Sequence, residues 1–421
     1  MLKIKKDASN DYIYDYVILG AGITGVSVAR LLQLRGVNNF KILETEKEAG
    51  GLCRTKKIGG HYLDIGGGHF LCSKYPEVYK FIFAHLPRKE FNLFDRVSKI
   101  ILDELAIDYS LESNLWQLPR EKRNEYLLSI IYNKSRGKKN IRDFETWSRS
   151  NLGDKITDTY MLPYNEKLWG TQMRKMGVDW LNKIPQLDVN EILLSYHNKV
   201  NLKKKFPSHV EFYYPRQGGF QAIFDSISDK VKDSITLNTP ITKLEYRKKR
   251  WLINGHLNAR KIINTMPWPK LYKALGSPEN IKKEFSNLKA ASIVVSLWEK
   301  KYNHNWHWTY IPSPKVPYHR EFFIHNFAPY NNPKGLYTET NFKRWPGRGR
   351  IWPGQKKPIY EWVNEFAYPI PLIGHTQSIR KILDFYAGKN LFGLGRWGQW
   401  QYFNSDVCIH QAMIFVKNNL D

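Results

Sequence analysis

Near its N-terminus the sequence reads Gly20-Ala-Gly22-Ile-Thr-Gly25, directly after the apolar run Tyr16-Val-Ile-Leu19. The apolar run predicts a buried strand, and the glycines predict a tight turn that opens a helix over 26–34. Such a turn presents backbone N–H groups and the positive end of a helix to a pyrophosphate. A second apolar strand over 40–43 ends in Glu44, at the spacing of about twenty residues that suits a carboxylate binding an adenosine ribose. The stretch therefore predicts a dinucleotide-binding fold.

Glycine turns also occur outside nucleotide sites, because glycine serves wherever φ must be positive. Two later motifs favour FAD over NAD. In the first, Gly50-Gly51-Leu-Cys-Arg54-Thr55, the chain would pass closely over the pyrophosphate. In the second, Asp64-Ile-Gly66-Gly67-Gly68-His69, the glycines would allow an approach without side chains near an isoalloxazine ring. The sequence therefore predicts bound FAD.

The composition is that of an enzyme with several domains. The chain has 421 residues, of which 42% are hydrophobic and 14% aromatic, enough for two or three cores. We expect no transmembrane segment, because no apolar run reaches about 18 residues. We expect no secretory signal either, because Met1-Leu-Lys-Ile-Lys-Lys6 is not followed by an apolar region. Three cysteines provide no disulfide framework, which favours a cytoplasmic location.

The net charge is strongly basic, with 65 Lys+Arg against 39 Asp+Glu and a formal charge of +26. Such values are common among nucleic-acid-binding chains. Here the basic runs are scattered and none belongs to a known nucleic-acid motif, so we predict a solvated lysine-rich surface and no nucleic-acid partner. The electrostatic field of these positive charges would still attract an anionic substrate.

The fold class that we predict is α/β, with a Rossmann-like FAD-binding domain, an inserted helical domain and a substrate domain built on a mixed or antiparallel sheet. The FAD-binding domain would comprise residues 1–76, 210–290 and 386–421, the helical insertion 77–209, and the sheet-containing domain 291–385. Other predicted helices cover 120–132, 144–150, 188–196, 377–386 and 406–418. Other predicted strands cover 259–267, 292–298, 306–311, 322–327 and 390–393.

Two common kinds of catalytic site are not expected. None of the twelve histidines lies at metal-ligand spacing from cysteines or carboxylates, so we predict no metal. A nucleophile elbow of the form G-x-S-x-G is also absent from the sequence.

The second half carries arginines within aromatic segments that we expect to be strands. These motifs are Trp308-Thr-Tyr310, Arg320, Ala367-Tyr368-Pro369 and Gly395-Arg396-Trp-Gly-Gln-Trp-Gln-Tyr402-Phe-Asn404-Ser-Asp406. A further segment, Met161-Leu-Pro-Tyr164-Asn165-Glu-Lys167-Leu-Trp169, precedes them. In these motifs, and in 64–69 with one extra glycine, the chain resembles the UDP-galactopyranose mutase family, particularly its larger eukaryotic type. The resemblance extends from about residue 14 to about 410.

The resemblance implies a role for each matching residue. Arg320 and Arg396 would clamp the substrate diphosphate, a task that suits the planar guanidinium, and tyrosine hydroxyls would donate to the same phosphates. His69 would lie beside the reactive edge of the flavin, and Asp406 near the flavin end of the last helix. The other substrate-binding residues implied are Tyr310, Tyr368, Tyr402, Trp169, Trp308 and Asn404. Asn404 matches less well, because the segment before it is two residues shorter than in the family.

The base-binding motif departs from the family pattern Y-P-F-Q-N-N and reads Tyr109-Ser-Leu111-Glu112-Ser-Asn114. Tyr109 is kept and could stack on a base, whereas Leu111 replaces an aromatic residue and Glu112 replaces a glutamine. A carboxylate only accepts hydrogen bonds, so it would suit the adjacent N1–H and N2–H₂ donors of guanine better than uracil. UDP- and GDP-sugars therefore both stay open, as does the simpler interpretation that Glu112 faces water.

The resemblance implies a flavin-dependent mutase that interconverts pyranose and furanose forms of a nucleotide-diphosphate sugar for surface polysaccharide synthesis. Reduced FAD would act as a covalent catalyst through N5, with NADPH or NADH as external reductant, and a homo-oligomer stays open. Two other classes stay open. One is an FAD-dependent oxidoreductase of the amine-oxidase and protoporphyrinogen-oxidase type, which would not require the two arginines. The other is a catalytically idle flavoprotein that serves as a binding or assembly subunit.

Overall fold

The computed structural model describes residues 12–135, 140–181, 184, 187–203, 210–300, 302–328, 335–348 and 357–420. The chain divides into two compact units. Unit 1 contains Met1–Gly51, Phe224–Leu288 and His375–Asp421, and unit 2 contains Leu52–Ile223 and Lys289–Gly374. The predicted α/β class is confirmed. The three domain boundaries stay predictions, and residues 1–6, on which the signal-segment prediction rests, lie outside the described residues.

Unit 1 is built on a seven-stranded sheet with the order β10-β11-β12-β1-β2-β9, and β18 pairs with β12. Its strands are β1 (Ile13–Leu19), β2 (Phe40–Leu43), β9 (Ile235–Thr236), β10 (Leu244–Arg247), β11 (Arg250–Ile253), β12 (Leu257–Asn264) and β18 (Leu391–Gly393). The pairs β1–β2, β1–β12, β2–β9 and β12–β18 are parallel. Val17, Ile18, Ile42, Ile262 and Ile263 are fully buried, as expected of parallel strands covered on both faces.

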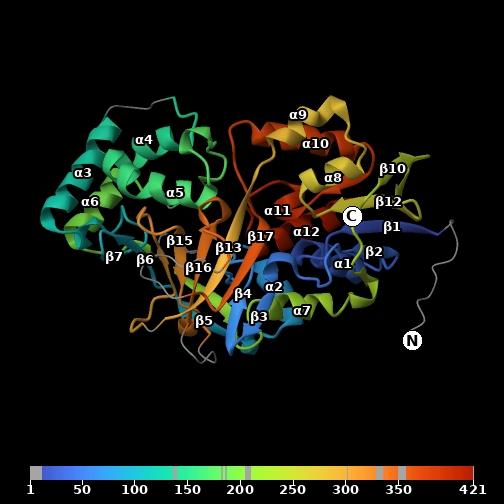
Figure 1. The fold of residues 1–421 in the computed structure, drawn as a ribbon, viewed down its shortest axis with the longest axis horizontal. Helices are drawn as coiled ribbons and strands as arrows, with labels where there is room; N and C mark the ends of the chain where they lie inside the picture. Colours follow the sequence, from blue (N-terminus) through green and yellow to red (C-terminus); the bar gives the residue numbers. More distant parts are fainter. Residues whose placement is uncertain are drawn as a thin grey trace. The chain divides into compact units, whose positions relative to one another are not determined.

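The helices of unit 1 are α1 (Ile23–Leu34), α8 (Trp268–Ala274), α9 (Lys282–Asn287), α10 (His375–Ala387), α11 (Gly395–Gly398) and α12 (Ser405–Leu420). Helix α1 packs against α12, and α9 packs against both α8 and α10 (Figure 1). Helix α7 (Gln221–Ser228) crosses the boundary between the units. The predicted strands over 40–43 and 390–393 and the predicted helices near 377–386 and 406–418 are thus confirmed.

Unit 2 is built on a second seven-stranded sheet with the order β17-β13-β16-β15-β14-β6-β7. Its strands are β6 (Ser98–Leu102), β7 (Leu105–Asp108), β13 (Ala290–Glu299), β14 (Trp308–Tyr310), β15 (Tyr318–Phe322), β16 (Gly335–Asn341) and β17 (Tyr360–Pro369). All neighbours are antiparallel except β6 and β14, which are parallel. The sheet is therefore mixed, as predicted.

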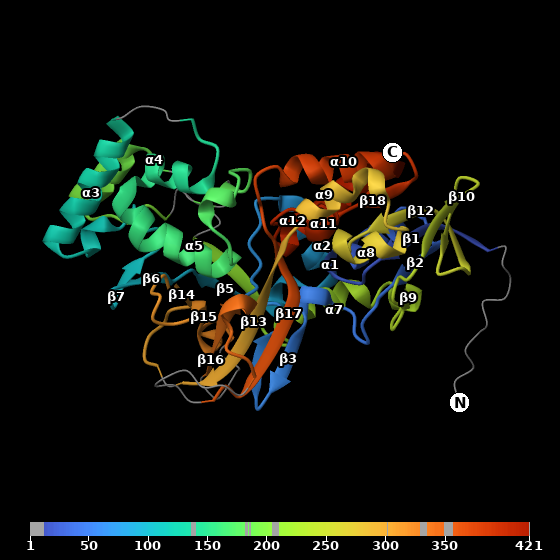
Figure 2. The same ribbon diagram turned by 45° about the horizontal axis from the view of Figure 1, so that its top comes forward.

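Helices and two small sheets complete unit 2. The helices are α2 (Pro76–His85), α3 (Arg120–Ser135), α4 (Phe144–Ile156), α5 (Leu162–Trp169) and α6 (Val189–Asn198). The small sheets pair β3 (Thr55–Ile58) with β4 (His61–Asp64), and β5 (Phe91–Asp95) with β8 (Glu211–Pro215). Helices α3 and α4 lie beside the β6–β7 end of the large sheet in both views (Figure 1; Figure 2), and α5 packs against β15 and β16.

Local sequence explains where two of these helices begin. The side chain of Asp143 accepts a hydrogen bond from the Thr146 N–H at the start of α4. At the start of α6, Asp188 and Glu191 form a reciprocal capping box, which satisfies two N–H groups that a helix otherwise leaves unpaired. These signals agree with the helices predicted over 144–150 and 188–196.

Two secondary-structure predictions were wrong in part. Of the predicted strand over 322–327 only Phe322 is a strand residue, at the end of β15, where it lies opposite Trp308 at the start of β14. The Phe323 N–H instead donates to the His307 carbonyl, and the chain turns through a single 3₁₀ turn, Ile324–Asn326. The stretch predicted as mostly helical after residue 76 also contains β5, β6 and β7, of which β6 and β7 extend a sheet formed mainly by residues 290–369.

Candidate functional site

In unit 1 the parallel strands end at one edge of the sheet, which places the dinucleotide motif. Leu19 lies opposite both Leu43 and Asn264 in the parallel pairs. The first glycine of the motif and Glu44 therefore follow side by side at the carboxyl end of the strands, where ligands bind in open α/β sheets.

The three glycines of the motif differ in what surrounds them. Gly20 has φ +101°, and a Cβ there would lie 2.6 Å from Thr265 Oγ1. A Cβ on Gly25 would lie 2.1 Å from the Gly20 carbonyl oxygen. Gly22 has an ordinary backbone conformation, and no atom lies within 4 Å of the position of its missing Cβ. Packing thus explains Gly20 and Gly25, whereas open space surrounds Gly22.

The N-terminus of α1 is suited to an anion. Its N-cap is Gly22, no side chain caps it, and its first turn contains no acidic residue. The free N–H groups and the helix dipole therefore favour a negatively charged group. The Gly50 N–H donates to the Ala21 carbonyl, and Gly51 has φ +54° with its missing Cβ 3.5 Å from the Gly22 Cα. The second predicted glycine motif, at Gly50 and Gly51, thus lies against the Gly20–Gly25 turn.

Glu44 is held at the end of β2 by two backbone donors. Its Oε2 accepts from the Ala21 N–H at 2.8 Å, and its Oε1 accepts from the Glu46 N–H at 2.9 Å. Each carboxylate oxygen has more than one lone pair, so a ribose hydroxyl could still donate to it. Together with the uncapped helix and the open space at Gly22, this arrangement fits the adenosine and pyrophosphate parts of FAD.

The last predicted motif belongs to the same unit. Gly395 has φ +73°, and its missing Cβ would lie 2.2 Å from Thr24 Oγ1, so α11 begins against the first turn of α1. Arg396 lies on α11 and not on a strand as expected, and its Nε donates to the Phe403 carbonyl. Asp406 is buried in the first turn of α12. Tyr402 is half-buried and Asn404 is exposed in the loop between these helices.

In unit 2, contacts within the protein explain why residues 66–68 are glycines. Cβ atoms on Gly66 and Gly68 would lie 1.9 Å from the Leu52 carbonyl oxygen and from the Phe322 ring. Gly67 has φ +100°, and its Cβ would lie 2.4 Å from Glu339 Oε1. The imidazole of His69 lies with Nδ1 2.8 Å from the Gly67 carbonyl oxygen. The cofactor roles predicted for these residues stay predictions.

The residues that precede this loop have structural partners. Thr55 Oγ1 donates to Asp64 Oδ1 at 2.6 Å, and the Tyr214 hydroxyl donates to Asp64 Oδ2 at 2.8 Å. Burial raises the pKa of Asp64 to about 6 although these donors oppose the shift. Arg54 is buried and lies 5.4 Å from the Trp362 ring. The predicted cofactor contacts of Arg54 and Thr55 stay predictions.

Arg320 lies opposite Glu339 across β15 and β16. Its Nε and a terminal nitrogen lie 3.1 and 2.7 Å from Glu339 Oε2, and the same terminal nitrogen donates to the Tyr368 hydroxyl at 3.2 Å. Glu339 is fully buried, and its Oε1 accepts from the Gly68 N–H at 2.8 Å. The charge and hydrogen bonds of Arg320, together with the His319 ring 3.3 Å away, lower the pKa of Glu339 to about 2 although burial opposes the shift. Glu339 therefore connects the predicted diphosphate-binding arginine to the glycine loop.

A second arginine, which the sequence did not reveal, joins three predicted residues. Arg96 is buried and donates to the Tyr310 hydroxyl at 2.9 Å. Its guanidinium carbon lies 5.3 Å from the Tyr109 ring centre and 4.7 Å from that of Trp308. The Trp308 indole N–H also lies 3.1 Å from the Tyr310 oxygen. The structure thus brings Tyr109, Trp308 and Tyr310 together around Arg96.

The residues predicted to surround a base and a sugar are largely buried. Trp169 is fully buried, with its ring 6.0 Å from that of Tyr368, and its indole N–H faces Asn165 Oδ1 at 3.3 Å. Leu111 is fully buried and Glu112 is 5% exposed. The interpretation that Glu112 faces water was therefore wrong. Burial raises the pKa of the Glu112 carboxyl to about 7.

Sequence reasoning missed Arg96, Glu339 and Lys167 as candidate residues. Lys167 is 1% exposed and donates to the carbonyls of Ile311 and Ser313, and burial lowers its pKa to about 7. Charged residues within otherwise apolar segments were the available signal. That signal does not identify the group that each charged residue contacts, because the contacting group lies on a strand or helix distant in sequence.

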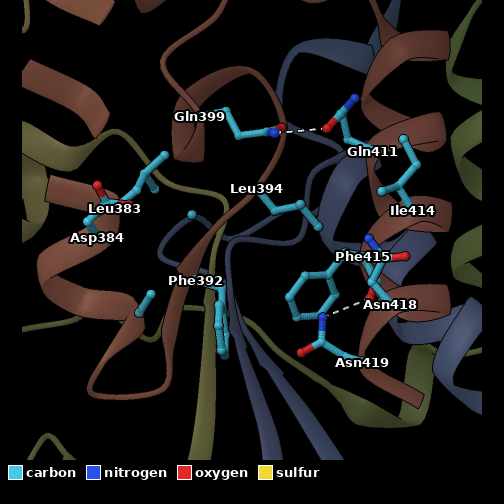
Figure 3. A pocket seen from close by; sticks show the side chains of 12 residues that line it. Leu383, Asp384, Phe392, Leu394, Gln399, Gln411, Ile414, Phe415, Asn418 and Asn419 are labelled. Carbon is cyan, nitrogen blue, oxygen red and sulfur yellow. Dashed lines mark hydrogen bonds between the residues drawn. The ribbon is translucent and has the colours of Figure 1, made fainter. Parts of the chain in front are cut away.

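A separate hollow of about 290 Å³ lies in unit 1 between α10, β18, α11 and α12 (Figure 3). Across it, Gln399 Nε2 donates to Gln411 Oε1 at 2.8 Å. Leu383, Phe392 and Ile414 supply apolar lining, and none of the candidate site residues borders the hollow. Its lining therefore suggests no chemistry related to the predicted site.

The family follows from comparison with known proteins. The model of the flavin-containing amine oxidoreductase family matches residues 23–296. The chain belongs to this family of flavin-dependent enzymes, which supports FAD as the cofactor.

Solved structures share the fold at low sequence identity. The chain is similar to a reduced UDP-galactopyranose mutase, with a TM-score of 0.86 and 21% identity over 97% of this chain and 95% of that one. It is also similar to a putative protoporphyrinogen oxidase from Exiguobacterium sp. 255-15, with a TM-score of 0.73 and 14% identity over 96% and 98%. Wild-type putrescine oxidase bound to putrescine gives a TM-score of 0.62 and 13% identity over 97% and 99%. At these identities the likeness shows the fold and not the activity.

Gly22→Ala tests the dinucleotide site. The backbone accepts alanine there and the new Cβ meets no protein atom, so we expect unchanged thermal stability of the flavin-free protein. Flavin affinity should fall at least about tenfold, a cost of about 1.4 kcal/mol, because the methyl group would fill the space assigned to the pyrophosphate. Flavin absorbance after gel filtration and titration with FAD measure the loss. Gly388→Ala, also in open space, is the control, and full flavin retention by Gly22→Ala would contradict the assignment.

Glu339→Gln tests the buried ion pair. The change leaves Arg320 without its partner charge, so we expect the free energy of unfolding to fall by about 3–5 kcal/mol. Because the folded pKa lies near 2, below the ordinary 4.5, this difference should be present above pH 4.5 and disappear as the pH falls toward 2. Urea unfolding at several pH values measures it. Glu361→Gln is the control, because within the described residues Glu361 accepts only from the neutral Ser296 and Trp345.

Proposed function

We propose that the protein is a flavin-dependent mutase that interconverts the pyranose and furanose forms of a nucleotide-diphosphate sugar. The family supports a flavin enzyme, and the likeness to a reduced UDP-galactopyranose mutase extends over nearly the whole chain. The single observation that carries the proposal is the cluster of cations and tyrosine hydroxyls in unit 2, around Arg320 and Arg96.

That cluster is suited to a diphosphate. Arg320 with the Tyr368 hydroxyl, and Arg96 with the Tyr310 hydroxyl, each pair a guanidinium with an O–H donor. Phosphate oxygens accept from both kinds of donor, and charge-assisted hydrogen bonds are the stronger ones. An amine substrate, which is a cation, would be repelled by the two guanidinium cations.

The polar groups would also hold the leaving group during the reaction. When bound in reduced form, the flavin supplies an electron pair that permits displacement of the diphosphate and reclosure of the sugar ring without net oxidation. Arg320 and the tyrosine hydroxyls would stabilise the charge of the departing diphosphate and keep it positioned for return. Glu339 would fix the orientation of Arg320.

Activity of the reduced protein tests the proposal directly. The purified holoprotein is reduced with dithionite without oxygen and incubated with UDP- and GDP-sugars, and the isomers are separated by chromatography. We expect isomer formation only in the reduced state, with the oxidised protein as control. Oxygen-consuming turnover of an amine or another donor, without any isomer, would favour the oxidoreductase. Flavin retention with no turnover of any kind would favour an idle binding subunit.

Arginine variants test the diphosphate contacts. Arg320→Lys keeps the charge beside Glu339 but loses the planar fork, and Arg396→Lys makes the same change in unit 1. Because lysine does not replace arginine at bidentate contacts, we expect retained flavin absorbance and a loss of kcat/KM of at least about 100-fold, equivalent to about 2.7 kcal/mol. Arg380→Lys, whose side chain is 83% exposed, is the control. Normal turnover in both variants would remove the diphosphate assignment.

A further inference from the structure

Glu112 is an unusual carboxylate within unit 2. It is 5% exposed, and a buried carboxylate is normally paired with a cation or with several donors. Here the Ser110 hydroxyl donates to Oε1 at 2.8 Å. In the described part of the chain no lysine or arginine forms an ion pair with Glu112, and no side chain other than Ser110 donates to it. The carboxylate therefore has acceptor capacity that the protein does not use.

In the described part of the chain, the donors to the Glu112 carboxylate are the Ser110 hydroxyl and the backbone N–H of Glu112 itself. The other polar groups nearby bond to one another. Asn114 Nδ2 donates to the carbonyls of Asp108 and Ser110 and to Ser113 Oγ. Ser113 Oγ in turn donates to the Ser110 carbonyl at 3.0 Å. These donors bond to backbone and hydroxyl oxygens, so none of them reaches the Glu112 carboxylate.

A group of tyrosine rings that contact one another lies near the segment that carries this acid. Tyr109 precedes it and lies with its ring centre 4.9 Å from that of Tyr310. The Tyr164 ring meets Tyr310 edge-on at 5.5 Å, and Tyr160 lies 5.7 Å from Tyr164. Glu112 is close enough to Tyr160 to raise the pKa of its hydroxyl, after the larger effect of burial. Flat rings beside a fixed hydrogen-bonding group are what a stacked heterocyclic base requires.

The chemistry of the carboxylate discriminates among bases. An ionised carboxylate only accepts, and its two oxygens match two adjacent N–H donors. Guanine offers such a pair in N1–H and N2–H₂. Uracil offers one N–H between two carbonyl oxygens, which a carboxylate would repel, and cytosine and adenine each set an acceptor nitrogen beside their amino group. A mismatch in a buried site leaves polar groups unpaired and is costly.

We propose that Glu112 selects the base of the nucleotide substrate and that this base is guanine, so that the substrate class is a GDP-sugar. The inference rests on the proposed function, in which a nucleotide-diphosphate sugar binds to unit 2. Tyr109 supplies the stacking surface, and the Ser110–Asn114 cluster holds the carboxylate in place. Donation from N1–H and N2–H₂ stabilises the ionised form of a carboxyl whose burial otherwise favours protonation.

Binding of the nucleoside diphosphates themselves tests this inference. Isothermal titration of the oxidised holoprotein with GDP and with UDP is carried out at pH 8, where the carboxyl is mostly ionised. We expect GDP to bind at least about tenfold more tightly, about 1.4 kcal/mol. Glu112→Gln should weaken GDP at least about tenfold and leave UDP unchanged or tighter, because an amide both donates and accepts. Glu112→Asp, which keeps the charge but shortens the reach, should weaken GDP without any gain for UDP.

A matched control separates base selection from a general effect of removing a buried acid. Glu321, also in unit 2, is 8% exposed and accepts from the Thr309 hydroxyl, so Glu321→Gln should leave the GDP preference intact. Tighter UDP binding by the wild-type protein, or a GDP preference that survives Glu112→Gln, would overturn the guanine assignment and leave the mutase proposal standing. Binding of neither diphosphate would overturn both. If Glu112→Gln does not fold, the relative affinities of the wild-type protein and of Glu112→Asp for GDP and UDP still test the guanine assignment.

Discussion

The arrangement of unit 2 depends on one buried carboxylate. Glu339 lies on a central strand of the large sheet with no exposure to solvent, so its charge has to be balanced within the protein. Arg320 provides that balance from the neighbouring strand, and the Gly68 N–H provides a further donor. The same carboxylate occupies the space where a side chain on Gly67 would lie. One constraint thus orients an arginine and shapes a loop.

Unit 1 is suited to an anion for a different reason. Its parallel strands end together, and the chain turns there into a helix whose first N–H groups have no side-chain cap. Backbone donors and the helix dipole carry no side-chain entropy cost and need no counter-ion. Unit 2 instead presents side chains, namely guanidinium groups and tyrosine hydroxyls. The first arrangement suits a permanently bound dinucleotide, and the second suits a substrate that must be distinguished from others.

The fold does not decide between the activities of similar proteins. The structures of a mutase, a putative protoporphyrinogen oxidase and a putrescine oxidase all align with nearly the whole chain. What differs among such enzymes is the set of side chains in the substrate-binding part. In this chain that set combines Arg96, Arg320 and Glu112 with several tyrosines, which is the basis for the nucleotide-sugar substrate that we propose. The surplus of positive charge across the sequence agrees with an anionic substrate.

The sequence alone determined the nucleotide fold, because a glycine turn, an apolar strand and a carboxylate at fixed spacing are local requirements of one ligand. It also identified Arg320, Tyr310 and Glu112 as candidates through motifs within short segments. Only the tertiary structure decided their partners: strand register sets Arg320 opposite Glu339, and β6 joins a sheet formed by residues some two hundred positions later. Burial of Glu112 and the position of Arg96 are likewise non-local, because they depend on which distant segments pack around them.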